Sequence, residues 1–525
     1  MNKIIKIINY LAGLLDGSFI DFKSQKFIKY CFKRWSRIDD EPRESIVLVE
    51  LYGVHQTVLA FSYFANILAE KHQSKILSFS LSYRSKLIYY LRNRKMIEIY
   101  KSFNVKSHLN MNITARQLNR ALYTVEDILL GIKSKHDVLN ILIDGNLVGN
   151  EIYEAYLKEH SKPTIDIFSI EFRNFLLECV KTYVFWYDYF NKNDVKGVVL
   201  SHGIYRYGII KTIANRKGIP VYLPTVRSLY CLNKPDEWGI PRYDLYHEQF
   251  QLLSHEARLN GLDWAKERLS LRLSGKVGVD MSYSTKSAFN PNFFSNNVLR
   301  KSNRIKVLIT THCFFDNPNC YGRNLFPDFY EWISFLGEIS EITNYDWYLK
   351  SHPDLMPGND EVLSELLNKY KNITRLPSET SHLQLVDEGI SFVLTVYGSV
   401  GHEYPLLGTT VINAGNKNPH VGYDFNIHAN NIKEYRNYLL NLEKIKHKAD
   451  IEKIYEFYFM HHKICGVIEN FFFKSFDNFL STISAKDQNS SIAYEYYLNE
   501  ITQESDELIC HKIEKFIESG DYRLY

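Results

Sequence analysis

The sequence predicts an α/β protein of two domains, each built on a parallel β-sheet. A chain of 525 residues is too long for one hydrophobic core, so two domains of roughly 200 residues or more are expected. Short apolar, β-branched runs alternate with segments of helical spacing, which is typical of βαβ units. The runs are continuous and do not alternate with polar residues, because a parallel strand is buried on both faces.

The first half begins with a helix over residues 22–37 and then repeats the strand-helix pattern. Predicted strands cover residues 46–51, 76–79, 138–143, 197–200 and 219–223, and predicted helices cover residues 56–69, 115–132, 168–190, 208–217 and 250–275. Residues 282–303 are rich in Ser and Asn and have no periodicity, so they are expected to link the two domains.

The second half repeats the pattern around the stretch GISFVLTVYGSVGHEYPLLGTTVINAG, residues 389–415. Predicted strands cover residues 305–310, 347–350, 390–396 and 410–412, and predicted helices cover residues 328–339, 360–370, 402–407, 432–460 and 466–480. Gly398 and Gly401 are expected to let the backbone approach a ligand. Pro405 is expected in the first helical turn, where proline is tolerated. The predicted division is residues 1–285, 286–465 and a tail of helices and polar residues, 466–525.

The amino-acid composition makes some classes of function less plausible for this protein. The net charge is only +3 and the basic residues are scattered, which argues against a nucleic-acid-binding protein. Aromatic residues make up 14% of the chain; packing is the first explanation for them, and stacking on carbohydrate is the second. The seven cysteines, none of them in a CxxC pair, are expected to be reduced thiols of a cytoplasmic protein. They are Cys31, Cys179, Cys231, Cys313, Cys320, Cys465 and Cys510.

The N-terminal run IIKIINYLAGLL is apolar but short, and Lys6 and Asn9 interrupt it. It lacks the length of a membrane-spanning helix and the cleavage site of a signal peptide. It is expected either to pack on the first domain or to lie in a membrane interface, with Lys3 and Lys6 facing the lipid headgroups.

Polar side chains follow three predicted strands of the second domain. They are His312 and Asp316, Lys350 and His352, and Ser399, His402 and Glu403. A lone His or Lys at a strand end is more often a solvated loop residue than a ligand-binding residue. Parallel strands, however, bring their carboxyl ends to one edge of a sheet, where ligands bind. A nucleotide sugar needs cationic or amide donors for its phosphates and a carboxylate for its ribose hydroxyls. Lys350 and His352 could supply the donors, and Glu403 the carboxylate.

The first domain offers three candidates for a catalytic base that takes the proton of an acceptor hydroxyl. Asp144 is the first choice, His55 the second, and His202, followed by Tyr205, the third. For each of them the alternative is a turn or capping residue, and Asp before Gly is a common turn pair.

Several known motifs are missing from the sequence. It has no GxxxxGK[ST] phosphate loop, no HExxH, no GxSxG and no GxGxxG after the first strand. ATP hydrolysis, zinc proteolysis, esterase chemistry and NAD-dependent redox chemistry are therefore not expected. No DxD pair follows a predicted strand, so the sequence predicts neither a metal site nor a cofactor.

Taken together, several segments resemble bacterial capsule and O-antigen biosynthesis glycosyltransferases. The resemblance covers most of residues 45–460. In the second half it lies in THCFFDNPNCYGRNLFPDFYEWI, YDWYLKSHPD, VLTVYGSVGHEYPLLGTTVINAG and NPHVGYDF, and in the first half in LVGNEIYEAYLKEHSKPTID and VVLSHGIYRYGIIKTIANRKGIPVY. It implies a GT-B-type enzyme, with two Rossmann-like domains facing across a cleft. The C-terminal domain would hold the nucleotide-sugar donor, and the N-terminal domain the glycan acceptor.

The segment from Lys350 to Pro353 is similar to the KHP element of capsule transferases that use CMP-activated acidic sugars such as Kdo, although Ser351 is inserted between Lys and His. By this resemblance His352 faces the donor phosphate and Glu403 faces the ribose, and no metal is needed. The expected activity is transfer of a sugar to a surface glycan or its lipid-linked precursor, at the inner face of the plasma membrane. A nucleotide-sugar epimerase and a non-catalytic glycan-binding factor are the alternatives.

Overall fold

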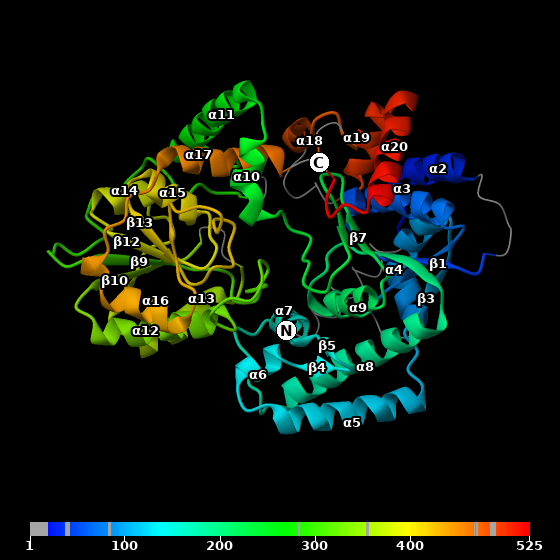
Figure 1. The fold of residues 1–525 in the computed structure, drawn as a ribbon, viewed down its shortest axis with the longest axis horizontal. Helices are drawn as coiled ribbons and strands as arrows, with labels where there is room; N and C mark the ends of the chain where they lie inside the picture. Colours follow the sequence, from blue (N-terminus) through cyan, green and yellow to red (C-terminus); the bar gives the residue numbers. More distant parts are fainter. Residues whose placement is uncertain are drawn as a thin grey trace.

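The computed structural model describes residues 19–36, 43–81, 86–281, 284–352, 356–466, 468, 471–482 and 490–524. It contains two six-stranded sheets, each covered by helices on both faces and each in its own half of the molecule (Figure 1). The predicted fold class, α/β with two Rossmann-like domains facing across a cleft, is confirmed. The predicted N-terminal segment with Lys3 and Lys6 lies outside the described residues.

The first sheet has its first strand in the middle, and the strand order reverses there. Its order is β3 (Val105–Leu109), β2 (Lys75–Phe79), β1 (Ile46–Glu50), β6 (Val195–Val199), β7 (Val221–Pro224) and β8 (Leu229–Leu232). All neighbours are parallel except β7 and β8. Every residue of β1 is buried, which explains its continuous apolar run.

Two sets of helices cover the first sheet. Ile46 and Leu48 point to one face and Val47 and Val49 to the other, as the two-residue period of a strand requires. The first face is covered by α5 (Ala115–Gly131), α7 (Gly149–His160), α8 (Ile170–Lys192) and α9 (Tyr205–Arg216). The second face is covered by α2 (Phe22–Trp35), α3 (His55–Lys71) and the C-terminal helices α18 (Phe476–Thr482), α19 (Ile492–Glu500) and α20 (Gln503–Ser519). Helix α4 (Lys86–Ser102) contacts α2 and connects β2 to β3.

The second sheet is parallel throughout and has the same central reversal. Its order is β11 (Ile373–Arg375), β10 (Asp346–Lys350), β9 (Lys306–Thr310), β12 (Phe392–Thr395), β13 (Thr410–Asn413) and β14 (Ile427–His428). One face packs on α12 (Phe329–Ile342), α13 (Asn359–Lys369) and α16 (Ile432–Leu440), and the other on α14 (His382–Asp387) and α15 (Val400–Leu406).

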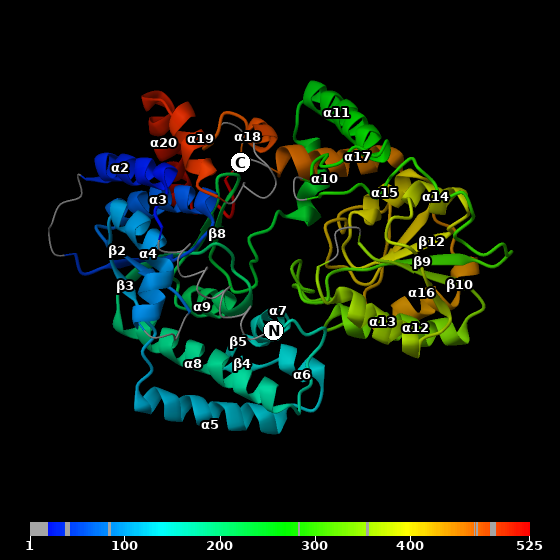
Figure 2. The same cartoon turned by 180° about the vertical axis from the view of Figure 1, so that it is seen from behind.

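The chain crosses between the two halves of the molecule twice. Helices α10 (Tyr246–Gln251) and α11 (His255–Leu273) share a core with α17 (Ile451–Phe459), beside the second sheet (Figure 2). The C-terminal residues return to the first sheet, where the amide of Cys231 donates to the carbonyl of Tyr522 at 2.9 Å. The predicted domain boundary at residue 285 stays a prediction. Helices α10 and α11 precede this boundary in sequence but pack on α17, which follows it.

Some element predictions were wrong, and each error has a local cause. Residues 138–143 are not a sheet strand: Ser134 and Asp137 form a capping box that starts α6 (Lys135–Leu139), and β4 (Leu142–Ile143) pairs only with β5 (Asn146–Leu147) in a hairpin. Residues 432–460 form two helices, α16 and α17, and α18 begins only at Phe476. Helix α15 begins at Val400, so Pro405 lies in its second turn. The short strands β3, β8, β11 and β14 were missed.

No helix in the described ranges is both long and apolar enough to cross a lipid bilayer.

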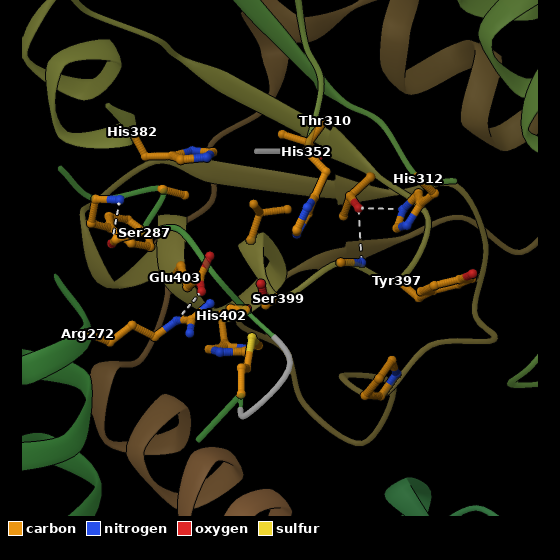
Figure 3. A pocket seen from close by; sticks show the side chains of 18 of the residues that line it. Arg272, Ser287, Thr310, His312, His352, His382, Tyr397, Ser399, His402 and Glu403 are labelled. Carbon is orange, nitrogen blue, oxygen red and sulfur yellow. Dashed lines mark hydrogen bonds and ion pairs between the residues drawn. The ribbon is translucent and has the colours of Figure 1, made fainter. Parts of the chain in front are cut away.

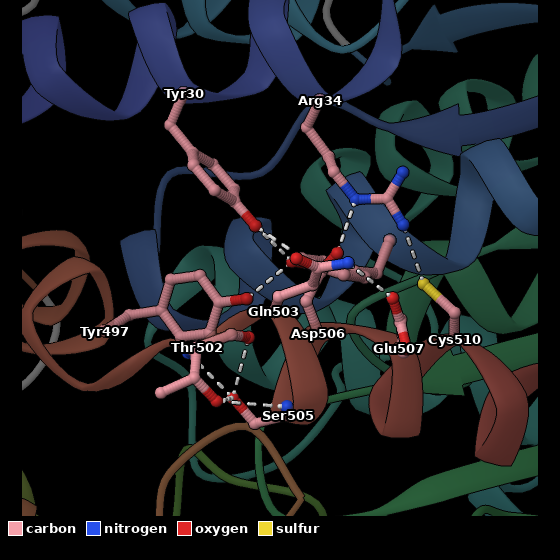
Figure 4. Close-up of polar contacts among 10 residues, drawn as sticks. Tyr30, Arg34, Tyr497, Thr502, Gln503, Ser505, Asp506, Glu507 and Cys510 are labelled. Atoms are coloured by element: carbon pink, nitrogen blue, oxygen red, sulfur yellow. Dashed lines mark hydrogen bonds and ion pairs between the residues drawn. The ribbon is translucent and has the colours of Figure 1, made fainter.

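A partly buried polar cluster holds the C-terminal helices on the first domain (Figure 4). The carboxylate of Asp506 on α20 accepts hydrogen bonds from the hydroxyls of Tyr30 and Tyr63, and from Arg34 Nε at 2.8 Å. The Tyr63 and Tyr497 hydroxyls are 2.5 Å apart. One carboxylate therefore connects α2, α3 and α20, segments more than 440 residues apart in sequence.

We expect Asp506→Ala to loosen this end of the molecule, because Arg34 and two phenols would lose a charged acceptor. Amide hydrogen exchange in α2 and α20 should speed up about 30-fold, which corresponds to about 2 kcal/mol of local opening free energy. Asp521→Ala, an exposed carboxylate on the same C-terminal segment, is the control and should leave exchange unchanged. Equal protection in the two variants would show that the cluster does not hold the helices.

Candidate functional site

A cavity of about 310 Å³ opens at the carboxyl ends of the central strands of the second sheet (Figure 3). It lies where the strand order reverses, between β9 and β12, which is where open α/β sheets bind ligands. Residues that follow β9, β10 and β12 line it. They are Thr311 and His312, then Ser351 and His352, and then Tyr397, Gly398 and Ser399.

Six of the seven predicted donor-binding residues line this cavity. They are His312, Lys350, His352, Ser399, His402 and Glu403. Parallel register explains the convergence, because β10 and β12 both pair with β9 and end at the same edge. The structure thus brings these residues together, and their contacts with a donor stay a prediction.

Positive charge dominates the cavity. Among the described residues, Glu403 is the single acidic residue that lines it, and it is already paired with Arg272. Lys276, Lys286 and Lys350 also line the cavity, and none of them has an ion pair among the described residues. Lys276 and Lys286 are exposed, whereas Lys350 is only 2% exposed. A buried cation without a partner is costly, so the cavity is suited to an anion.

Burial lowers the pKa of Lys350 to about 8, while the negative charges of Glu379 and Glu403 act in the opposite direction. At neutral pH Lys350 is therefore mostly charged, and it loses this charge a little above neutrality. A lysine in this state is a strong donor to phosphate oxygens.

His312 is held as a neutral ring by its surroundings. It stacks on Phe329 with ring centroids 4.8 Å apart and lies 4.5 Å from the ring of Tyr397. Burial lowers its pKa to about 3. Its Nε2 accepts a hydrogen bond from the amide of Val396 at 3.3 Å, so this bond assigns the ring proton to Nδ1. His312 can thus donate a hydrogen bond but is unsuited to act as a base.

Glu403 is fixed by a residue that the sequence did not indicate. Arg272 Nε, on α11, donates to Glu403 Oε1 at 2.5 Å, and the glutamate side chain is 2% exposed. The two residues are 131 positions apart, and α11 reads only as a charged helix. No pattern in the sequence marks Arg272, because the pairing depends on how α11 packs beside the second sheet.

Histidines form the floor of the cavity. His402 Nδ1 and His420 Nε2 are 3.2 Å apart, and burial lowers both pKa values well below the usual range. Gly401 was expected to let the backbone approach a ligand, but a Cβ there would lie 2.4 Å from the His420 ring, so this glycine makes room for the histidine. His382, His461 and His462 also line the cavity. Among the described residues, no three potential ligand side chains are placed to hold one metal ion.

Four buried polar atoms of lining residues lack hydrogen-bond partners in the described part of the chain. They are Ser351 Oγ, His402 Nε2, His420 Nδ1 and His462 Nε2. Buried polar atoms are nearly always satisfied, so a polar ligand or ordered water is expected beside them.

Asp316, the seventh predicted donor residue, does not line the cavity. Its Oδ1 accepts a hydrogen bond from the Tyr205 hydroxyl at 2.6 Å, and Lys158 Nζ lies 3.5 Å from the same atom. Tyr205 and Lys158 belong to the first domain, so Asp316 connects the two domains.

The three predicted bases lie apart from one another, and none lines a described cavity. Asp144 was expected at the end of a buried strand, but it occupies the turn of the β4–β5 hairpin with a φ of 47° and pairs with Arg120. His55 begins α3 and packs edge-on against Tyr494, 4.9 Å away, below the C-terminal helices.

His202 follows β6, as expected, and its Nδ1 is 2.5 Å from the hydroxyl of Ser201. Burial lowers the pKa values of both His55 and His202 to about 4. Their roles as bases stay predictions, and the geometry around them favours neither.

A second, larger cavity of about 1140 Å³ lies between the two domains, where a cleft was expected. The first domain contributes Asn150, Arg216, Lys234 and Trp238, and the second contributes Tyr321 and Lys417. Within the described ranges, neither amide atom of Asn150 has a hydrogen-bond partner, although Asn150 is only 4% exposed. Tyr321 lines both cavities, and its ring lies 5.0 Å from Tyr397 and 5.4 Å from Tyr243. The two cavities therefore share a wall.

Comparison with solved structures finds only distant similarities. The beta Kdo 2,4 transferase KpsC of Thermosulfurimonas dismutans is 13% identical, with 50% of this chain and 79% of that chain covered and a TM-score of 0.30. A glycosyltransferase from Rickettsia africae ESF-5 is 12% identical, with 87% and 100% covered and a TM-score of 0.25. The UDP-GlcNAc 2-epimerase of Neisseria meningitidis, bound to UDP-GlcNAc, is 12% identical, with 78% and 97% covered and a TM-score of 0.22. No protein-family model and no curated protein matches the sequence. These TM-scores carry no argument about activity.

The pKa of Lys350 gives a testable pH dependence. Anion binding requires the charged form, which is abundant at pH 7 and scarce at pH 9, so the dissociation constant of a bound nucleotide should rise about tenfold between them. Burial lowers the pKa values of His312, His382, His402, His420, His461 and His462, so these rings stay neutral over this range, and the phosphate stays ionised. Calorimetry at pH 7, 8 and 9 measures this pH dependence of the dissociation constant. In Lys350→Arg, whose side chain stays charged up to pH 9, the dissociation constant should not change with pH. If the variant shows the same pH dependence as the wild type, Lys350 is not the group that titrates.

Proposed function

We propose that this protein transfers a sugar from a nucleotide-sugar donor to a growing capsule, O-antigen or related surface glycan. The observation that carries the proposal is the position of Lys350 in a cavity at the reversal point of a parallel sheet: this lysine is buried and forms no ion pair with any residue that the structure describes. The excess of positive charge favours a phosphate-bearing ligand, and the unsatisfied polar atoms beside it favour a ligand rich in hydroxyls.

In this proposal the second domain holds the donor. Lys350 and the Nδ1–H of His312 donate to the phosphates, together with His352 at the cavity edge. Glu403, held by Arg272, accepts from the ribose hydroxyls. Lys350 also stabilises the negative charge that grows on the leaving phosphate, so the reaction needs no metal. By resemblance, the donor is a CMP-activated acidic sugar.

The acceptor glycan is proposed to bind in the second cavity. Trp238 and Tyr243 offer apolar ring faces for a sugar, and Arg216, Lys234 and Lys417 offer donors for acidic groups. Tyr321 stands between the two cavities, so a glycan end beside it lies next to the donor sugar. The acceptor is either the glycan itself or its lipid-linked precursor. A lipid-linked acceptor would agree with the proposed location of the protein, in the cytoplasm at the inner face of the plasma membrane.

A nucleotide panel tests the donor site. Calorimetry with UDP, CMP, GDP and CDP should show binding of one base, and Lys350→Met should weaken that binding at least tenfold, since it keeps the side-chain length and removes the charge. Lys371→Met, an exposed lysine after α13, is the matched control and should bind like the wild type. If none of the four binds, and Glu403→Ala has no effect in cells that make the polysaccharide, the transferase proposal fails.

Product analysis separates the transferase from the epimerase alternative. An epimerase converts free nucleotide sugar when no acceptor is present, whereas a transferase at most hydrolyses it slowly. A glycan-binding factor without catalysis would bind the glycan and leave the nucleotide sugar intact. Conversion of the nucleotide sugar in the absence of an acceptor would therefore show that the protein is an epimerase and not a transferase.

The second cavity has its own test. Trp238→Ala should raise the KM for the acceptor about tenfold, because stacking area is lost, and leave the nucleotide dissociation constant unchanged. Trp264→Ala, a tryptophan on α11 outside both cavities, is the control. Loss of nucleotide binding in Trp238→Ala, with an unchanged KM for the acceptor, would contradict this assignment.

A further inference from the structure

We propose that the outer face of helix α2 binds the surface of an anionic lipid bilayer. Six exposed residues at helical spacing form this face, called here the α2 stripe: Phe22, Gln25, Lys26, Lys29, Phe32 and Lys33. The opposite face, with Ser24, Phe27, Cys31 and Trp35, is buried against the first domain. The helix therefore has its own packed side, and the stripe is not needed for folding.

Large apolar side chains are exposed on the stripe. Phe22 is 68% exposed and Phe32 is 53% exposed, and Phe19, just before the helix, is 70% exposed. Single exposed hydrophobic residues are common, but three phenylalanines within one short segment expose a patch that favours an apolar partner. Lys26 Nζ lies 4.7 Å from the centre of the Phe22 ring, so cationic and aromatic groups share this surface.

The charge of α2 is entirely positive, since residues 22–36 contain no Asp or Glu. The neighbouring acids are used by other cations. Glu495 pairs with Lys23, Asp506 with Arg34, and Asp21 with Lys95 of α4. Lys26, Lys29 and Lys33 have no acidic partner among the described residues and all lie on the stripe.

A helical face with lysines and phenylalanines suits a membrane interface. The phenyl rings would enter the boundary between headgroups and acyl chains, and the lysines would contact anionic headgroups. The charge complementarity favours anionic lipid over a neutral surface, and the exposed rings favour lipid over a purely polar polyanion such as nucleic acid.

The location of α2 leaves the cavities open. In both views of the fold it lies on the outer side of the first domain, beside α19 and α20, and far from the second sheet (Figure 2). A bilayer bound there would not cover the cavity at β9 and β12. This inference does not depend on the proposed transferase activity.

Cosedimentation of the full chain with vesicles tests the inference. Vesicles of phosphatidylcholine with 30% phosphatidylglycerol should bind the protein, and pure phosphatidylcholine vesicles should bind it at least tenfold more weakly. The variant K26Q/K29Q/K33Q should lose at least tenfold in affinity for the anionic vesicles. F22S/F32S should also weaken binding, and most clearly at high salt, where the charge attraction is screened.

The matched control is K444Q/K446Q/K448Q, which removes three exposed lysines from the second domain and changes the net charge equally. It should bind vesicles like the wild type. The inference is wrong if the α2 variant and this control lose affinity equally, or if the wild type ignores the anionic vesicles. It is also wrong if the α2 variants change only the binding of duplex DNA or only the oligomeric mass. Nucleotide binding by calorimetry should be unchanged in every variant, so failure here is distinguishable from failure of the proposed activity.

Discussion

The position of the candidate site depends on the reversal of strand order between β9 and β12. Helices that follow neighbouring strands in opposite directions must separate, and the gap between them opens at the carboxyl ends of those strands. The loops after β9, β10 and β12 all reach this gap, so residues 312, 350 and 399 meet without any local sequence relation. The charged residues and histidines of the site, and its contact with the first domain, all lie at this edge of the second sheet.

Electrostatics then decides what kind of ligand the cavity suits. Arg272 neutralises Glu403, so the remaining charge comes from lysines, one of which is buried. His312 and His402 are neutral because burial lowers their pKa values, and thus they act as hydrogen-bonding groups. A polar lining with an excess of positive charge, part of it on a buried lysine, suits an anionic ligand such as a phosphate ester.

The two domains are held in contact by side chains as well as by the chain crossings. Tyr205 and Lys158 meet Asp316 across the cleft, and Tyr153 donates to Asp328, the residue that caps α12. These contacts place the second cavity directly beside the first, with Tyr321 between them. The C-terminal helices add a further link, since Asp506 fastens α20 to α2 and α3.

The sequence by itself determined the fold class and most of the buried strands, because a parallel strand covered on both faces must be a continuous apolar run. It also predicted six residues that line the cavity at β9 and β12, because parallel strands end at one edge. Short edge strands such as β8 and β14 were not recognisable, since so few residues show no periodicity. Asp144 was misplaced because an apolar run of six residues fits a strand as well as a capped helix and a hairpin. Only the tertiary structure decided that Arg272 pairs with Glu403, that Asp316 contacts the other domain, and that His55 is covered by α19. Each of these depends on contacts between segments far apart in sequence, and such contacts have no local signature.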